Sequence, residues 1–220
     1  MWFLRIILVA CCGGVVGYGL NRVVAHFSRK MLSENTLLNP SPWWRCPVHG
    51  LPVLTAVLSG LMAWRFGSTG WLEGGLVFLW VLLALVAIDL ETFLLPDALT
   101  LPLIWAGLLF NSGAGFVNLH EAVWGAVAGY AVLALVYWLY WAVARREGVG
   151  QGDFKLLAAL GAWLGWQALP LLLLIASLSG VLFGTAWLRF HKQSRHTPIP
   201  FGPFLALAGV GVMLWGSKGG

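Results

Sequence analysis

The chain has 220 residues, of which 60% are hydrophobic and only 10% are charged, and its mean hydropathy is +0.84. Soluble domains carry about a quarter charged residues, so the composition excludes an ordinary soluble fold and predicts a membrane protein. The net charge of +5 fits the Lys and Arg of cytoplasmic loops, and no basic run is long enough to predict a nucleic-acid partner. Cys11, Cys12 and Cys46 imply no disulfide framework.

Uncharged runs locate the expected helices, because a membrane-spanning helix needs about 20 mostly apolar residues. The run 156–188 is too long for one helix and short for two, and the segment from Gly165 to Pro170 offers a turn near its middle. We therefore divide it there and expect an all-α, polytopic membrane protein with about eight transmembrane helices. We take the apolar N-terminus as a retained first span, because the rest of the chain is equally apolar. The other expected helices cover residues 6–21, 51–64, 74–88, 98–119, 122–144 and 197–217.

The basic residues support this division. With eight spans and the N-terminus outside, segments 22–50, 145–155 and 189–196 face the cytoplasm and hold ten of the thirteen Lys and Arg residues. The positive-inside rule predicts this asymmetry, whereas a single helix over the long run would place the last segment outside. The same topology brings Asp89 to the cytoplasmic end of the third helix and Asp153 to the cytoplasmic start of the sixth.

Three carboxylates, Asp89, Glu91 and Asp97, lie in an otherwise apolar stretch. A charged group near the bilayer core costs at least about 2.5 kcal/mol, so such residues usually face a cavity and carry a function. The plainer alternative is that these side chains reach the cytoplasmic interface and end helices. We assign no role to Glu91.

A fourth carboxylate, Asp153, follows two glycines in Gly150-Gln151-Gly152-Asp153. Glycines permit a tight backbone just before a helix, although Asp153 could also be a simple N-cap. The element gains weight from Asp89 at the same membrane depth. Two carboxylates that share one site do not both ionise easily, so one can activate water while the other protonates a scissile carbonyl. The chain offers no convincing metal cluster and no Ser/His/Asp arrangement.

Three motifs carry a family resemblance. Ile88-Asp89 followed by Leu95-Pro96-Asp97 resembles the IDxxxxxLPD-type motif of bacterial type IV prepilin peptidases. Gly150-x-Gly152-Asp153-Phe154-Lys155 resembles their GxGDxK motif, and Pro200-Phe201-Gly202-Pro203-Phe204 resembles their PFGPF segment. The resemblance covers residues 74–210 in consistent order.

The resemblance implies a GxGD-type intramembrane aspartyl protease that removes the basic leader from prepilins or type II secretion pseudopilins at the cytoplasmic face of the inner membrane. Asp89 and Asp153 match the catalytic pair, and residues 1–73 and 74–220 would form an N-terminal unit and a catalytic domain. Lys155 would set the local charge near Asp153. The implied supporting positions are Asp97, Gly150, Gly152, Lys155, Pro200, Gly202 and Pro203, with the proline-rich segment shaping a substrate channel. The partners would be the substrate and the bilayer, and nothing in the pattern indicates an oligomeric state.

The chain departs from the family in its first cytoplasmic loop. Many members also methylate the new N-terminus with S-adenosylmethionine and carry two zinc-binding CxxC pairs there. This chain has one CxxH, Cys46-Pro47-Val48-His49, which by itself cannot complete a tetrahedral zinc site. A YPLVE-like stretch of the family aligns with Leu51 to Thr55, which puts Thr55 in place of its Glu. We therefore expect no zinc, no S-adenosylmethionine and weak or absent methyltransferase activity.

Two other functions are compatible with part of this pattern. A degenerate family member could bind pilin or secretion-system subunits without cutting them, but the retained Asp89 and Asp153 argue against it. A small proton-coupled transporter would also use intramembrane carboxylates. Transporters often show internal repeats and midplane sites, whereas this chain shows no comparable repeat and its acidic residues lie near one face.

Overall fold

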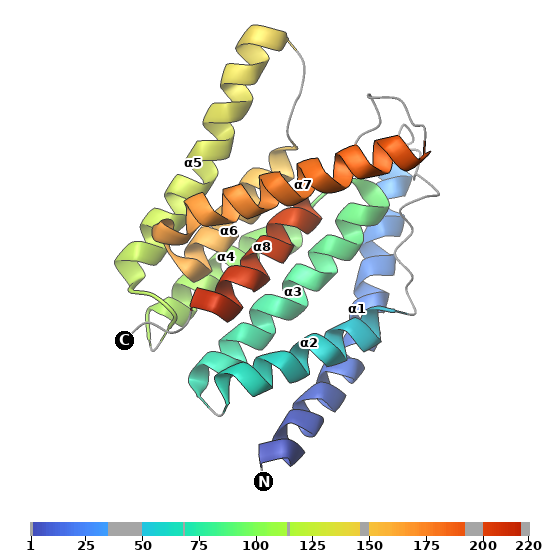
Figure 1. The fold of residues 1–220 in the computed structure, drawn as a ribbon, viewed down its shortest axis with the longest axis vertical. Coiled ribbons are helices and arrows are strands. Elements are labelled where there is room, and N and C mark those ends of the chain that lie inside the picture. Colours follow the sequence, from blue (N-terminus) through green and yellow to red (C-terminus); the bar gives the residue numbers. More distant parts are fainter. Residues whose placement is uncertain are drawn as a thin grey trace.

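The structure, a computed structural model, describes residues 2–34, 50–67, 69–113, 115–145, 150–191 and 200–216. These residues form eight α-helices and one short 3₁₀ helix, without a strand among them (Figure 1). Four helices, α1, α3, α5 and α7, are long and apolar enough to cross a membrane. The predicted all-α polytopic membrane fold is confirmed. The helices are α1 (Trp2–Glu34), α2 (Leu51–Phe66), α3 (Gly70–Thr92), α4 (Asp97–Asn111), α5 (Leu119–Ala144), α6 (Gln151–Leu164), η1 (Trp166–Ala168), α7 (Leu169–His191) and α8 (Gly202–Gly216).

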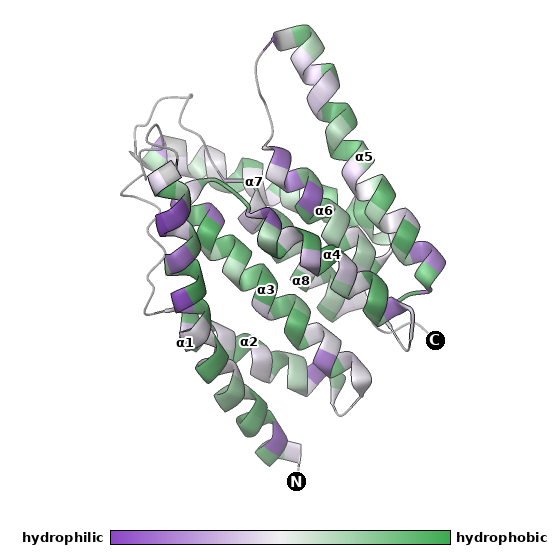
Figure 2. Ribbon diagram, turned by 180° about the vertical axis from the view of Figure 1, so that it is seen from behind, coloured by the Kyte–Doolittle hydropathy of each residue, from purple (hydrophilic) through white to green (hydrophobic). Residues whose placement is uncertain are grey.

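Helix α3 runs through the middle of the bundle and contacts α1, α2, α4 and α8. Its side chains Phe78, Leu79, Leu82, Leu85 and Ile88 are almost completely buried. The outer helices keep apolar side chains on their exposed faces as well, as expected for a bundle whose solvent is lipid. Figure 2 shows hydrophilic residues gathered along the upper part of α1 and at the first turns of α4 and α6.

Helix α6 is held tightly by its neighbours. Its backbone approaches that of α5 where Gly125 faces Gly161, and a Cβ atom added at Gly129 would lie 2.6 Å from the carbonyl oxygen of Leu157. Small residues allow such close contact between membrane helices. On the other side of α6, the indole of Trp163 donates to the Leu103 carbonyl at 2.9 Å, which joins α6 to α4. These contacts fix the position of α6 against α4 and α5.

The predicted break within residues 156–188 is confirmed. Helix α6 ends at Leu164, and Gly165 follows with φ +80°, a conformation that favours glycine. Helix α7 then begins at Leu169, which places Pro170 in its first turn, where proline is tolerated. The division of the chain at residue 74 falls inside α3 and stays a prediction.

Several expected helix boundaries are wrong, and those of the first and fourth helices differ most from the structure. The fourth helix ends at Asn111 and not at residue 119, because the Asn111 side chain binds the backbone around it. Its Nδ2 donates to the Ala162 carbonyl at 2.8 Å, and its Oδ1 accepts from the Phe116 amide at 2.8 Å. The first helix continues to Glu34, so part of the expected loop 22–50 is helical, because basic residues mark where a helix leaves the bilayer and not where it ends.

Candidate active site

Asp89 lies in the last turn of α3, immediately before a sharp change of direction. Phe93 ends the helix in the left-handed conformation, with φ 57°, and its amide donates to the Asp89 carbonyl at 2.8 Å. The Thr92 hydroxyl donates to the Ile88 carbonyl at 2.8 Å and accepts from the Leu94 amide at 3.3 Å. The Asp89 side chain is only 4% exposed. The turn therefore holds this carboxylate inside the bundle at the end of a helix.

Asp153 lies in the first turn of α6. Gly150 occupies the N-cap position, so the alternative in which Asp153 is the N-cap residue is wrong. The Asp153 amide donates to the Gly150 carbonyl at 3.1 Å, and its side chain is 7% exposed. The partial positive charge at a helix N-terminus favours a carboxylate in this turn.

Gly202, the first residue of α8, connects the C-terminal motif to the first carboxylate. Its amide donates to Oδ2 of Asp89 at 3.1 Å. A Cβ atom at this position would lie 2.6 Å from the same oxygen, so only glycine lets the backbone come this close. Pro200 is buried just before this contact, and Pro203 lies in the first turn of α8, where proline is tolerated.

Leu95 joins the three motifs, a role that the sequence pattern did not reveal. A Cβ atom at Gly152 would lie 2.8 Å from the Leu95 Cβ, and one at Gly202 would lie 3.6 Å from the Leu95 Cδ1. Both glycines thus lie close to this one side chain, which brings the starts of α6 and α8 against the α3–α4 connection. Leu95 belongs to the first motif, but an apolar side chain carries no chemistry that could have indicated this packing role.

Gly202, which binds Asp89, and Gly152, which precedes Asp153, both lie against Leu95, and the two aspartates are more than nine-tenths buried. The structure therefore places the two carboxylates, which belong to different motifs, in one largely buried region. Such a pair contains both a base and an acid for hydrolysis.

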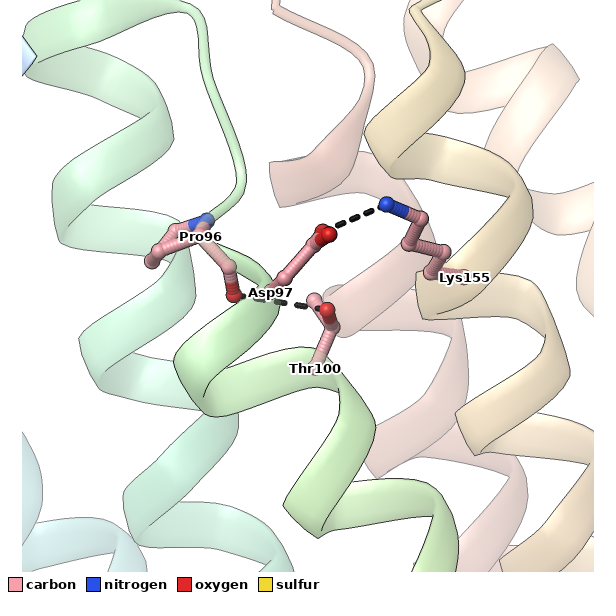
Figure 3. A network of polar contacts seen from close by, with 4 residues as sticks. All are labelled: Pro96, Asp97, Thr100 and Lys155. Carbon is pink, nitrogen blue, oxygen red and sulfur yellow. Dashed lines mark hydrogen bonds and ion pairs between the residues drawn. The ribbon is translucent and has the colours of Figure 1, made fainter.

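Lys155 pairs with Asp97 and ties the second motif to the first (Figure 3). Its Nζ lies 2.5 Å from Oδ1 of Asp97, and the two side chains are 28% and 57% exposed. The Thr100 hydroxyl donates to the Pro96 carbonyl at 3.3 Å and supports the same turn of α4. The ion pair links α4 to α6 at the edge of the site and gives Lys155 a carboxylate partner other than Asp153.

A groove of about 290 Å³ opens beside the C-terminal motif, between α7 and the start of α8. Phe201, which precedes Gly202, forms part of its wall. Its floor on the α7 side is formed by small residues, and Val181 at its rim is 62% exposed. The groove is lined by Ser177, Gly180, Val181, Pro200, Phe201 and Phe204.

The structure describes only some of the residues that bear on zinc binding and methyl transfer. Cys46 and His49 lie outside the described residues. Within the described ranges, no three or more His, Cys, Asp or Glu side chains are grouped to hold a metal ion. Thr55 is buried, and its hydroxyl donates to the Leu51 carbonyl at 2.7 Å. A Cβ atom at Gly17 of α1 would lie 3.0 Å from that hydroxyl, so this position faces a tight helix interface.

Fold and site together define a helical membrane protein with a buried pair of carboxylates. The sequence profile of the type IV leader peptidase family matches residues 76–185, and the chain belongs to that family. No solved structure matches the chain.

Several curated relatives are about half identical to the chain, and each bears the name prepilin leader peptidase/N-methyltransferase. The relative from Aeromonas hydrophila is 56% identical over 169 residues, which is 76% of this chain and 57% of the relative. The relative from Stutzerimonas stutzeri is 53% identical over 163 residues, 74% of this chain and 56% of the relative. The relative from Pseudomonas aeruginosa is 52% identical over 165 residues, 74% and 57% respectively. The chain thus spans less than two thirds of the length of these relatives.

Proposed function

We propose that this protein is a membrane aspartyl endopeptidase that removes the basic leader from type IV prepilins or type II secretion pseudopilins. The observation that carries the proposal is the buried pair of Asp89 and Asp153, with the Gly202 amide bound to the first carboxylate. The family and the names of the relatives support the same reaction. Cleavage by such a pair requires no metal ion and no covalent intermediate.

The two carboxylates divide the chemistry between them. The ionised member takes a proton from a water molecule, whose oxygen attacks the carbonyl carbon of the scissile peptide bond. The protonated member donates its proton to the carbonyl oxygen, which gives a neutral tetrahedral intermediate. When the C–N bond breaks, the leaving amine takes up the proton that the first carboxylate received, and the second carboxylate takes back a hydroxyl proton as the carboxylic acid product forms. Gly202 holds Asp89 in position through its amide during these steps.

The active site would face the cytoplasm from a multi-pass protein of the inner membrane. The start of α6, with Asp153, and the basic end of α1 lie toward the same end of the bundle (Figures 1 and 2). Arg22, Arg29 and Lys30 belong to that part of α1. Since Lys and Arg collect on the cytoplasmic side, this arrangement supports a cytoplasmic site.

The groove between α7 and α8 would receive the apolar segment of the substrate. It is apolar, opens toward the exposed face of α7, and reaches the catalytic region through Phe201 and the adjacent Gly202. The small side chains of Gly180 and Ser177 would leave room there for a bulky side chain of the substrate. The basic leader would then lie at the cytoplasmic end of the bundle, next to the carboxylates.

The methyl transfer named for the relatives would be weak or absent in this chain. A family Glu at the position of Thr55 would have to fit between α1 and α2, and the two helices already approach each other closely at Gly17. The single CxxH at Cys46 to His49 also lacks the ligands of a complete zinc site. Transfer of a radiolabelled methyl group from S-adenosylmethionine to cleaved pilin would contradict this part of the proposal.

Co-expression with candidate substrates tests the proposed reaction. Prepilins and pseudopilins produced with the intact protein should show the mobility shift of leader removal, and those produced with Asp89→Ala or Asp153→Ala should not. Glu73→Gln, a change at the opposite end of α3, is the matched control. Equal processing by all variants would contradict the proposal. Binding of substrate without processing by the native protein would favour a degenerate, non-cutting role.

A further inference from the structure

Helix α1 carries two adjoining grooves that lie away from the carboxylate pair. The apolar groove, of about 630 Å³, is lined by Cys11, Gly14, Val15, Tyr18, Gly19 and Arg22. The cationic groove, of about 650 Å³, is lined chiefly by Tyr18, Asn21, Arg22, His26, Arg29 and Pro52. Tyr18 and Arg22 belong to both grooves, so the two are continuous along the helix. Each volume lies within the range of about 300–1,000 Å³ that is typical of small-molecule sites.

The cationic groove gathers positive charge along one face of α1. Arg22, His26 and Arg29 are spaced by four and three residues, so they lie on one face of α1. All three are exposed, and no acidic side chain is among the described residues that line either groove. Arg29 uses its Nε to donate to the Ala25 carbonyl at 2.9 Å, which leaves the terminal nitrogens of its guanidinium to bind a ligand. Guanidinium groups bind phosphate with two parallel hydrogen bonds.

The apolar groove is open because two of the residues that line it, Gly14 and Gly19, have no side chain. A Cβ atom at Gly19 would meet nothing within 4 Å, and one at Gly14 would meet its nearest atom, Ala56 Cβ, at 3.7 Å. Gly17 differs, because a Cβ atom there would lie 2.6 Å from Pro52 of α2. Helix α2 therefore packs closely against α1 at Gly17, whereas the face of α1 that carries Gly19 stays open.

The order of the two grooves matches the depth profile of a membrane. The apolar groove lies along the hydrophobic part of α1, and the cationic groove follows where basic residues begin. A phospholipid of the cytoplasmic leaflet has the same order, with acyl chains in the core and an anionic phosphate at the interface. We propose that α1 binds one phospholipid with an anionic headgroup, its acyl chain in the apolar groove and its phosphate on Arg22, His26 and Arg29.

Native mass spectrometry of the purified full chain in detergent tests the proposal with three probes. Phosphatidylglycerol should remain bound as one lipid per protein. Phosphatidylcholine should bind at least about tenfold more weakly, because its headgroup carries no net charge. Inorganic phosphate, which lacks an acyl chain, should not be retained. Equal retention of both lipids, or retention of inorganic phosphate as well as the lipid, would overturn the assignment.

Two pairs of variants test the grooves separately. Gly19→Trp fills the apolar groove, whereas Gly211→Trp adds the same side chain to α8, at another position with nothing within 4 Å. Arg22→Gln removes one charge from the grooves, whereas Lys30→Gln removes one from an exposed position that lines neither of them. Gly19→Trp and Arg22→Gln should each weaken phosphatidylglycerol binding about tenfold, and their controls should not. Equal losses in a variant and its control would refute the site.

Discussion

Replacing Gly202 with alanine should move the carboxylate of Asp89 without changing any titratable group. The added Cβ would lie 2.6 Å from Oδ2 and 3.2 Å from Cγ of Asp89, whereas real Cβ atoms essentially never come within 3.0 Å of another group. The carboxylate, the start of α8 or both must therefore shift by several tenths of an ångström. The same shift lengthens the bond from the Gly202 amide, which is 3.1 Å in the native protein.

The expected loss of activity follows from that displacement. A hydrogen bond to a charged group contributes about 1.5–3 kcal/mol, and about 1.4 kcal/mol corresponds to a factor of ten in rate. A misplacement of about 1 Å at a reacting centre costs roughly a hundredfold. Gly202→Ala should therefore lower prepilin cleavage by about 10- to 100-fold. The same overlap in a packed site should lower the free energy of unfolding by about 1–3 kcal/mol.

The assay is single-turnover cleavage of a purified prepilin in mixed micelles, followed by the mobility shift of the product. Gly211→Ala is the matched control, since it makes the same change in the same helix where a Cβ atom meets nothing within 4 Å. It should retain the native rate. Cleavage by Gly202→Ala at the native rate, in a correctly folded protein, would refute the assigned contact between α8 and Asp89.

Three further substitutions test how the bundle supports the site. Lys155→Met removes the partly exposed ion pair with Asp97 and should lower the free energy of unfolding by less than about 1 kcal/mol, measured by denaturant titration in micelles. Asn111→Leu leaves buried backbone groups of α6 and of the following loop without a partner and should cost more than about 2 kcal/mol in the same titration; a loss as small as that of Lys155→Met would contradict the assigned bonds. Gly161→Leu drives a side chain into the backbone of α5 and should abolish the monodisperse peak in size-exclusion chromatography, whereas Gly113→Leu, at an open position, should keep it.

The helices could be predicted from the sequence because lipid imposes a simple requirement. A long uncharged run forms a helix, since no other regular structure satisfies the backbone within a bilayer except a closed barrel. The break near Gly165 was predicted because proline cannot lie in a helix interior without cost, and the length of the run demanded a turn. Both arguments use local information only.

Helix ends that depend on tertiary contacts could not be predicted. Helix α4 stops at Asn111 because its side-chain amide binds α6 and the loop that follows α4. The partner in α6, the Ala162 carbonyl, is 51 residues away in the sequence, and the partner in the loop, the Phe116 amide, comes within reach only once the helix has ended. The run without charged residues continues past Asn111 to residue 119, so the absence of charge gave no end point for the helix. Helix α1 continues to Glu34 because charged residues are compatible with a helix outside the membrane core.

The carboxylates of the site were predictable from residue type and depth, but their surroundings were not. A buried acidic residue is rare enough in a membrane segment to be noticed, so Asp89 and Asp153 stood out. Three contacts around the site depend on how α4, α6 and α8 pack together. They are the hydrogen bond from the Gly202 amide, the packing of Leu95 against Gly152 and Gly202, and the ion pair of Lys155 with Asp97. No spacing within one motif specifies those distances.

The most direct test of the central claim is the cleavage rate of the purified protein with Asp89→Asn or Asp153→Asn, measured on one prepilin under single-turnover conditions. Asparagine keeps the shape of the side chain but can neither take up nor give up the proton. Since general acid or base catalysis contributes about 10²- to 10⁴-fold, each variant should lose at least about a hundredfold in rate, with Glu73→Gln unchanged. A rate within a few fold of the native one for either variant would contradict the assignment of the pair.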